Sequence, residues 1–146
     1  MLATDFKIYA GSWAELEKDA KHIREQVFIQ EQEIAAQDEW DTDDAVSLHF
    51  IVYDENQAIA TARLLKNNSV GRVAVLNAYR GLGVGKLLMQ AIIEQAKQQE
   101  RDFLKLSAQV HALPFYAQLG FKQEGVEYLD CGIPHIDMRQ VFTSLK

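Results

Sequence analysis

Residues 73–88, VAVLNAYRGLGVGKLL, decide the fold predicted for this chain. The segment begins with a short apolar run, residues 73–76, whose two valines are typical of a buried strand. A glycine-rich bend over residues 80–86 then opens an amphipathic helix. Glycines expose the unpaired N–H groups of a helix N-terminus, and these groups attract anions together with the helix dipole. With Arg80 beside it, the bend predicts a site for a pyrophosphate group.

Two common phosphate-binding motifs do not fit this bend. A P-loop, Gly-x-x-x-x-Gly-Lys-Ser/Thr, would place its first glycine at Arg80 and its hydroxyl at Leu87. A dinucleotide-binding loop, Gly-x-Gly-x-x-Gly, would place its last glycine at Lys86 or Leu88. The remaining interpretations are a different anion-binding loop and a tight turn that only joins a strand to a helix.

The composition predicts one domain over residues 1–146. A chain of 146 residues is long enough for a substantial core, and 48% apolar residues exclude a disordered chain. No apolar run approaches the ~20 residues of a membrane span, and residues 1–5 lack the features of a signal peptide. The single cysteine, Cys131, cannot form an internal disulfide, which fits a reducing compartment. We therefore expect a cytoplasmic protein.

Negative charge is concentrated in one segment. The net charge of −6 argues against nucleic-acid binding and is compatible with a cationic substrate, although solubility also explains it. Residues 37–44 are expected to form a loop, either as a solvated connection with Trp40 packed on the core or as a lip that attracts an amine acceptor. The segment lacks the glycine and terminal glutamate of a calcium-binding EF-hand loop. Its carboxylates are Asp38, Glu39, Asp41, Asp43 and Asp44.

Residue periodicity predicts alternating helices and strands. Ser12 and Glu15 form a capping-box pattern before an apolar repeat that predicts a helix from 13 to about 30. Gly120, followed by Phe121, is placed as the C-terminal cap of a short helix. The expected strands are 6–9, 48–53, 58–65, 71–75 and 104–109, with two more between 122 and 142, and the other helices are 84–100 and 112–119. Three strands in series predict an antiparallel meander, and the crossover through helix 84–100 predicts a parallel pair.

A second motif lies in residues 107–121, where a strand is followed by Ala-x-x-Phe-Tyr-x-x-x-Gly-Phe. It resembles the second coenzyme A-binding motif of the GCN5-related N-acetyltransferases (GNAT), and Arg-Gly-x-Gly-x-Gly from Arg80 resembles their first. Segments 24–32 and 132–138, with the acidic loop that leads to His49, further resemble the ElaA/YjcF-like bacterial acetyltransferases. The resemblance covers nearly the whole chain and leaves the acceptor undefined.

The resemblance implies the GNAT fold, an α+β three-layer arrangement. We expect a mixed, mostly antiparallel twisted sheet of six to seven strands, with helices on both faces. The fourth and fifth strands should form a parallel pair that splays apart, so that the pantetheine arm lies between them like an additional strand.

The resemblance also implies acetyl-CoA as co-substrate and no metal. The main chain of strand 73–75 would bind pantetheine, and the N–H of Val75 or Leu76 would polarise the thioester carbonyl. Arg80 and the N–H groups of 81–86 would bind the pyrophosphate. The residues expected to bind coenzyme A are Val73, Ala74, Val75, Arg80, Gly81, Leu82, Gly83, Val84, Gly85, Lys86, Gln109, Phe115 and Tyr116.

The implied reaction is transfer of an acetyl group to a primary amine by direct attack in a ternary complex. Tyr116 matches the tyrosine that acts as general acid in relatives, and a pKa of ~10 would make proton transfer to the leaving thiolate only slightly uphill. His135 is the candidate base or acceptor contact. The alternatives for the base are His111, Glu39, Asp43 and a water molecule. Cys131 lacks a sequence partner that would make it a nucleophile.

The expected partner is a small-molecule or peptide amine, with no nucleic acid or membrane partner, and the protein is expected to be a monomer or homodimer. One alternative is a catalytically silent acyl-CoA-binding sensor or interaction module of the same fold. Another is acyl-homoserine-lactone synthesis on a related fold, for which the chain is short.

Overall fold

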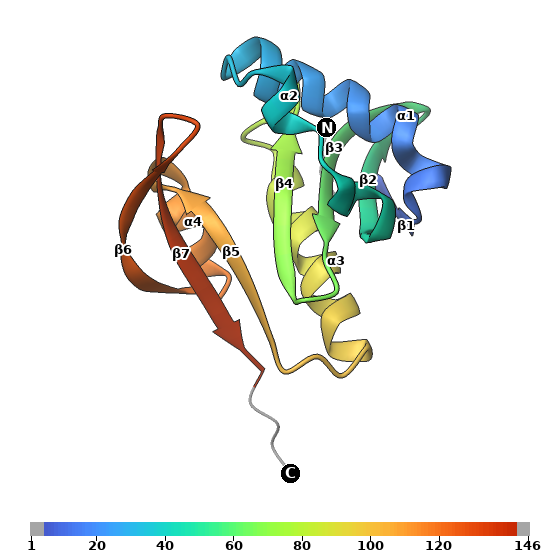
Figure 1. Ribbon diagram of the computed structural model, residues 1–146. Helices are drawn as coiled ribbons and strands as arrows, with labels where there is room; N and C mark the ends of the chain where they lie inside the picture. The colour runs from blue at the N-terminus through green and yellow to red at the C-terminus, as the bar shows by residue number, and fades with distance from the viewer. Residues whose placement is uncertain (1–4, 143–146) are drawn as a thin grey trace.

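Seven strands form one mixed sheet in the computed structural model, which describes residues 5–142, in the order β1-β2-β3-β4-β5-β7-β6 (Figure 1). Neighbouring strands run antiparallel except β4 and β5, which are parallel. The strands are β1 (Lys7–Gly11), β2 (Leu48–Asp54), β3 (Gln57–Leu64), β4 (Ser69–Val75), β5 (Phe103–Gln109), β6 (Lys122–Asp130) and β7 (Ile133–Val141). The predicted meander, crossover and parallel pair are confirmed.

Helices cover both faces of the sheet (Figure 1). Helix α1 packs on one face, where Ile23 shares a buried cluster with Ile51 and Ala74. Helices α3 and α4 lie on the other face and contribute Leu88 and Tyr116 to the larger core. The α-helices are α1 (Trp13–Arg24), α2 (Ala36–Glu39), α3 (Val84–Gln98) and α4 (Leu113–Gln118), and short 3₁₀ turns form η3 (Thr42–Val46), η4 (Asn77–Tyr79) and η5 (Val110–Ala112).

The first helix begins as predicted and ends differently. Glu15 N–H donates to Ser12 Oγ at 3.3 Å and Ser12 N–H donates to Glu15 Oε1 at 2.9 Å, which forms the expected capping box. The α-helix ends at Arg24, however, and a wider π-helical segment, η2 (Glu25–Glu31), follows it. The helix therefore continues to Glu31, close to the predicted end, but its last seven residues are π-helical and not α-helical. Apolar spacing does not reveal a shift from i+4 to i+5 hydrogen bonding, because both keep similar faces buried.

Helix α4 ends in the predicted Schellman motif. Gly120 adopts φ of 103°, Phe121 N–H donates to Tyr116 O at 3.1 Å, and Gly120 N–H donates to Ala117 O at 3.0 Å. The motif brings the rings of Phe121 and Tyr116 to a centroid distance of 6.0 Å. It thereby fixes the end of the helix that carries the candidate general acid.

Strands β4 and β5 separate after a short region of pairing. Their parallel ladder covers only the first two residues of β4 and ends at Val70. On its other edge β4 carries a bulge, because Arg72 and Val73 together face the single residue Ala62 of β3. Arg72 adopts φ of 53°, a left-handed conformation that favours glycine. Since a bulge bends its strand and increases its twist, β4 turns away from β5 at this point.

The acidic segment 37–44 is folded inward, which corrects the predicted solvated loop. It forms part of α2 and η3, and Glu39 and Asp44 are only 2% and 3% exposed. Both carboxylates bind the buried guanidinium of Arg24, at 2.8 Å to Glu39 Oε2 and 2.7 Å to Asp44 Oδ1. The Trp40 ring covers this guanidinium at 5.0 Å. Charge pairing therefore anchors α2 and η3 to α1.

Two strand arginines extend this buried network. Arg63 on β3 binds Asp41 at 2.6 Å and Asp44 at 2.8 Å. Arg72 at the bulge binds Glu39 at 3.1 Å and Asp41 at 3.2 Å. The hydrogen bond from Arg63 lowers the pKa of Asp41 to about 2, whereas burial raises the pKa of Glu39 in spite of the neighbouring guanidinium groups. The network thus connects α1, α2, η3, β3 and the bulge of β4.

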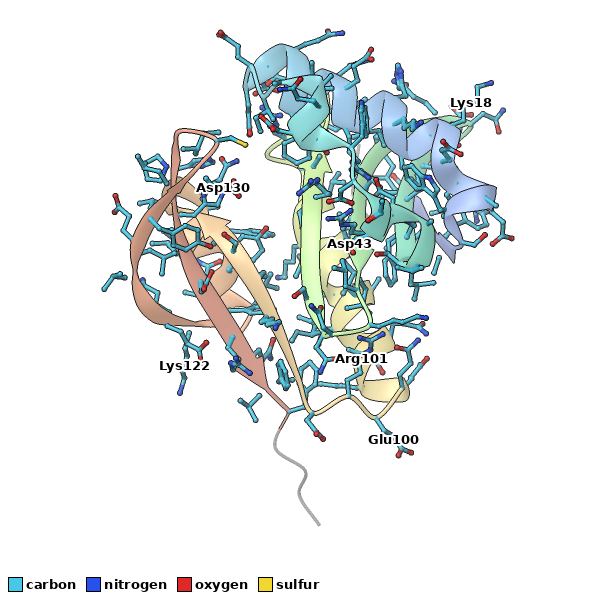
Figure 2. The ribbon with its side chains drawn as sticks, viewed as in Figure 1. Lys18, Asp43, Glu100, Arg101, Lys122 and Asp130 are labelled. Carbon is cyan, nitrogen blue, oxygen red and sulfur yellow. The ribbon has the colours of Figure 1, made fainter. Side chains whose placement is uncertain are left out.

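Replacing Arg24 by methionine is predicted to lower the free energy of unfolding by about 3–5 kcal/mol, because Glu39 and Asp44 would remain buried without their shared partner. Urea unfolding followed by circular dichroism measures this change. The control is Lys18→Met on the exposed side of the same helix (Figure 2), with an expected change within about 0.5 kcal/mol. A loss below about 1 kcal/mol in Arg24→Met would contradict the importance of the network.

Candidate active site

A cleft of about 1260 Å³ opens where β4 and β5 diverge. Its walls come from η2 and α2, from β4 and the start of α3, from β5 through α4, and from the β6–β7 turn. The residues expected to bind coenzyme A line this cleft with one exception, Leu82, whose side chain is 38% exposed at the surface. Tyr116 and His135 line it as well. Residues from distant parts of the sequence are therefore brought to one site.

Strand β4 offers a backbone edge to the cleft. Leu76 N–H donates to Ile59 O of β3 at 2.9 Å. Because successive N–H groups along a strand point to opposite edges, the N–H of Val75 faces the β5 side. The Val75 carbonyl also faces that side, where it accepts a hydrogen bond from Arg80 Nε at 3.0 Å. Of the two N–H groups considered for polarising a thioester carbonyl, Leu76 is therefore excluded and Val75 is retained.

The glycine-rich bend forms the N-terminus of α3. Gly81 and Gly83 adopt φ of 79° and 83°, and Gly83 is the N-cap residue. The first intrahelical hydrogen bond joins Leu87 N–H to Gly83 O at 3.0 Å. The N–H groups of residues 84–86 therefore have no acceptor within the helix. Free donors, the positive end of the helix dipole and the lack of side chains make this bend suitable for an anion.

The guanidinium of Arg80 is bound by a carboxylate from η2. Arg80 Nη1 and Nη2 donate to the two carboxylate oxygens of Glu31 at 2.5 and 2.7 Å. The hydrogen bonds lower the pKa of Glu31 and raise that of Arg80. A guanidinium binds phosphate in the same bidentate geometry. An anion on the glycine-rich bend would therefore compete with Glu31 for Arg80.

A second bridge joins η2 to the end of β5. Gln109 Nε2 donates to the side-chain carbonyl of Gln32, the residue that follows η2, at 2.9 Å, and both residues line the cleft. The Gln109 carbonyl oxygen lies 2.7 Å from His111 Nε2. Because that oxygen only accepts, Nε2 of His111 carries the proton. His111 Nε2 therefore donates a hydrogen bond to Gln109, and this nitrogen has no free lone pair to accept a proton.

Tyr116 belongs to α4 and packs into the larger core. Its ring is 8% exposed and makes edge contacts with Phe115 and Phe121 at centroid distances of 5.0 and 6.0 Å. Phe115 also packs on α3, since a Cβ on Gly85 would lie 3.2 Å from Phe115 Cζ. Burial raises the pKa of Tyr116 to about 12. The Tyr116 hydroxyl is therefore a weaker acid than the tyrosine of pKa ~10 on which the expectation of nearly matched pKa values depended.

His135 lies on β7 and is only 8% exposed. Its Nδ1 is 2.7 Å from Ile133 O, and because a carbonyl only accepts, Nδ1 carries the proton and Nε2 keeps its lone pair. The Tyr128 ring of β6 stacks on the imidazole at a centroid distance of 6.1 Å. The Tyr128 hydroxyl donates to Asp137 at 2.5 Å and is also hydrogen-bonded to Ser107. These contacts hold the imidazole in one orientation.

The other candidate groups are less suitable for proton transfer or nucleophilic attack. Glu39 is bound to two arginines in the buried network, and Asp43 is not among the residues that line the cleft. Cys131 is exposed at the β6–β7 turn, and slight desolvation together with the negative charges of Asp130 and Asp38 raises its pKa. A raised pKa disfavours the thiolate that nucleophilic attack would need.

Sequence reasoning missed several residues of this site. Nothing in the local sequence indicates that Glu31 binds Arg80, or that Tyr128 and Asp137 support the histidine. The signal that pointed toward Glu31 and Asp137 was their presence in segments 24–32 and 132–138, which carry the narrower family resemblance.

Comparison with known proteins identifies the family. A family model described as an acetyltransferase (GNAT) domain matches residues 14–142, so the chain belongs to the GNAT acetyltransferases. The protein named "Uncharacterized N-acetyltransferase YjcF" of Bacillus subtilis is 36% identical over 125 residues, which cover 83% of this chain and 89% of YjcF. The crystal structure of Escherichia coli ElaA matches with a TM-score of 0.84 at 30% identity, over 92% of this chain and 99% of that one. An acyl-CoA N-acyltransferase from Pseudomonas aeruginosa matches with a TM-score of 0.84 at 31% identity, over 93% and 99% of the two chains.

One structural neighbour, from Bacillus anthracis, was solved in complex with acetyl coenzyme A. It matches with a TM-score of 0.58 at 28% identity, over 66% of this chain and 62% of that chain. Across residues 5–142, no group of three or more His, Cys, Asp or Glu side chains is arranged to hold a metal ion. No helix in the same range is long and apolar enough to cross a membrane.

Replacing Glu31 by glutamine is predicted to raise the affinity for coenzyme A by up to about fivefold, because an exposed ion pair is worth about 0.2–1 kcal/mol and Arg80 would be released to the pyrophosphate. Isothermal titration calorimetry with coenzyme A measures the change. Glu33→Gln, an exposed neighbour outside the cleft lining, should leave the affinity unchanged. A weaker affinity in Glu31→Gln would instead mean that Glu31 holds Arg80 in its productive position.

Proposed function

We propose that this protein transfers an acetyl group from acetyl-CoA to a primary amine by direct attack within a ternary complex. The observation that carries this proposal is the edge of β4, where Val75 N–H faces the splayed cleft and the glycine-rich bend lies at its end. An extended chain with a terminal pyrophosphate matches both features at once. Family membership supports acyl transfer and leaves the acceptor open.

The residues at the donor end suit coenzyme A. Val73 and Val75 would pair with the pantetheine amides through their main chains, while Ala74 N–H and C=O serve the ladder with Thr61. The N–H groups of 81–86 and the guanidinium of Arg80 would bind the pyrophosphate. Gly81 and Gly83 adopt positive φ, and Phe115 packs closely against Gly85. Glycine at these positions lets the backbone bend around the pyrophosphate. When bound, acetyl-CoA supplies the activated acyl group.

The proposed chemistry uses three residues that line the cleft, one each from β7, β4 and α4. His135 Nε2 receives a proton from the amine as the N–C bond forms. Val75 N–H donates to the thioester carbonyl oxygen as negative charge develops on it. Tyr116 donates its hydroxyl proton to the sulfur as the C–S bond breaks, and both side chains return to their starting states by exchange with solvent. The high pKa of Tyr116 keeps this hydroxyl protonated at physiological pH.

A catalytically silent acyl-CoA sensor of the same fold is the second candidate. One observation favours it, namely the pKa of Tyr116 at about 12, which makes this residue a weak acid toward a thiolate. A sensor would need the donor end of the cleft and would not need His135.

Release of free thiol from acetyl-CoA on addition of a panel of primary amines tests the enzymatic function. Tyr116→Phe is predicted to lower kcat by about 10–100-fold and His135→Gln by about 100-fold, with coenzyme A affinity changed less than twofold in each. His22→Gln, which replaces an exposed histidine of α1 outside the cleft lining, is the control. Binding of coenzyme A without amine-dependent thiol release would favour the sensor. Loss of coenzyme A affinity in both Tyr116→Phe and His135→Gln would mean that the two side chains only support the packing of the site.

A further inference from the structure

The two ends of the cleft carry different charges. Lys86 and the ion pair of Arg80 with Glu31 lie at the donor end, beside the glycine-rich bend. The part of the cleft between α2 and the β6–β7 turn is lined by Asp38, Asp130 and His135, and we call it the acceptor end. From this distribution we propose that the acceptor is a primary amine that carries a second positive charge, as in an aliphatic diamine. This inference rests on the acetyltransferase function proposed above.

The buried arginine network adds no net charge to the acceptor end. Its three guanidinium groups bind three carboxylates, so their formal charges cancel. The six residues are Arg24, Arg63, Arg72, Glu39, Asp41 and Asp44. Of these six residues, Arg72 and Glu39 reach the cleft, where they bind each other at 3.1 Å. The positive charge of Arg72 is therefore already paired and does not repel a cationic ligand strongly.

Asp38 and Asp130 supply the uncompensated charge. Asp38 belongs to α2, and Asp130 ends β6 near the tip of the β6–β7 hairpin (Figure 2). Both residues line the same cleft, as does Cys131, which follows Asp130 in the β6–β7 turn. Within residues 5–142 neither carboxylate forms an ion pair. A cation that enters this end therefore meets two carboxylates without ion-pair partners among the described residues, beside one guanidinium, that of Arg72, which is already paired with Glu39.

A buried histidine provides the second, independent feature of the acceptor end. His135 is 8% exposed, and Ile133 O holds its Nδ1 proton, so Nε2 is the nitrogen available to the cleft. In the described part of the chain no group donates a hydrogen bond to Nε2. Nε2 is therefore free to accept a hydrogen bond from a donor on a ligand in the cleft. An amine N–H is such a donor.

The two features select for two cationic groups in one ligand. The reacting amine donates to His135 Nε2, and the second positive charge lies against Asp38 and Asp130. A monoamine has only one such group, so it cannot bind His135 and the carboxylates at the same time. Charge attraction also raises the local concentration of the cationic ligand, and this contribution falls as salt screens the carboxylates.

Binding of 1,5-diaminopentane and of pentylamine to the full chain saturated with coenzyme A tests this inference by calorimetry, without turnover. The diamine is expected to bind at least tenfold more tightly than the monoamine, and raising NaCl from about 50 to about 500 mM should reduce the preference severalfold. Asp38→Asn with Asp130→Asn should abolish it. Glu94→Gln with Glu100→Gln removes the same charge from the exposed surface of α3 and the following turn, and should leave the preference intact.

Equal affinity for the two amines, absence of diamine binding, or a preference that survives in the Asp38→Asn/Asp130→Asn variant would overturn the inference. The salt dependence of the unaltered protein decides the matter even if that variant fails to fold. A diamine preference in binding, without any thiol release from acetyl-CoA, would contradict the proposed enzymatic function while supporting this acceptor class. Turnover of both amines at the same KM would support the enzymatic function and contradict the inference of a diamine acceptor.

Discussion

Backbone hydrogen bonding along β4 is the constraint on which the rest of the structure depends. One edge of β4 pairs with β3, while the bulge at Arg72 and Val73 turns the strand away from β5. Val75 N–H is thereby left facing a cleft and not a neighbouring strand. Buried backbone groups without partners cost free energy, so such an edge favours an extended ligand that can pair with it. The glycine-rich bend lies where an anionic end of that ligand would reach the helix N-terminus.

The buried arginine network stabilises the geometry that makes this edge available. Arg72 adopts a left-handed conformation that costs an L-residue about 1 kcal/mol, and its ion pairs with Glu39 and Asp41 offset that cost. The same contacts anchor α2 beside the cleft. The same residues therefore stabilise the fold and shape the site. Because the formal charges of the network cancel, Asp38 and Asp130 dominate the electrostatic potential at the acceptor end.

Local signals in the sequence were sufficient for much of the fold. The capping box at Ser12, the Schellman ending at Gly120 and the glycine-rich bend each depend on residues close in sequence, and all three were predicted correctly. The inward folding of segment 37–44 could not be predicted, because its carboxylates find their arginines on α1, β3 and β4. At the bulge, Arg72 adopts a left-handed conformation that glycine usually adopts. Residue propensity therefore did not predict the bulge. The pairing of Glu31 with Arg80 joins residues that are far apart in the chain, and it depends on the fold bringing the end of η2 to the loop that precedes α3.

Site-resolved amide hydrogen exchange at Val75 tests most directly whether the open edge of β4 binds the donor. In the free protein, Val75 N–H should exchange faster than Leu76 N–H, which is bonded to Ile59 O at 2.9 Å. Saturating coenzyme A should slow exchange at Val75 by about tenfold or more, since a new hydrogen bond protects the amide, while Leu76 changes little. Binding of coenzyme A with unchanged exchange at Val75 would contradict the role of this edge.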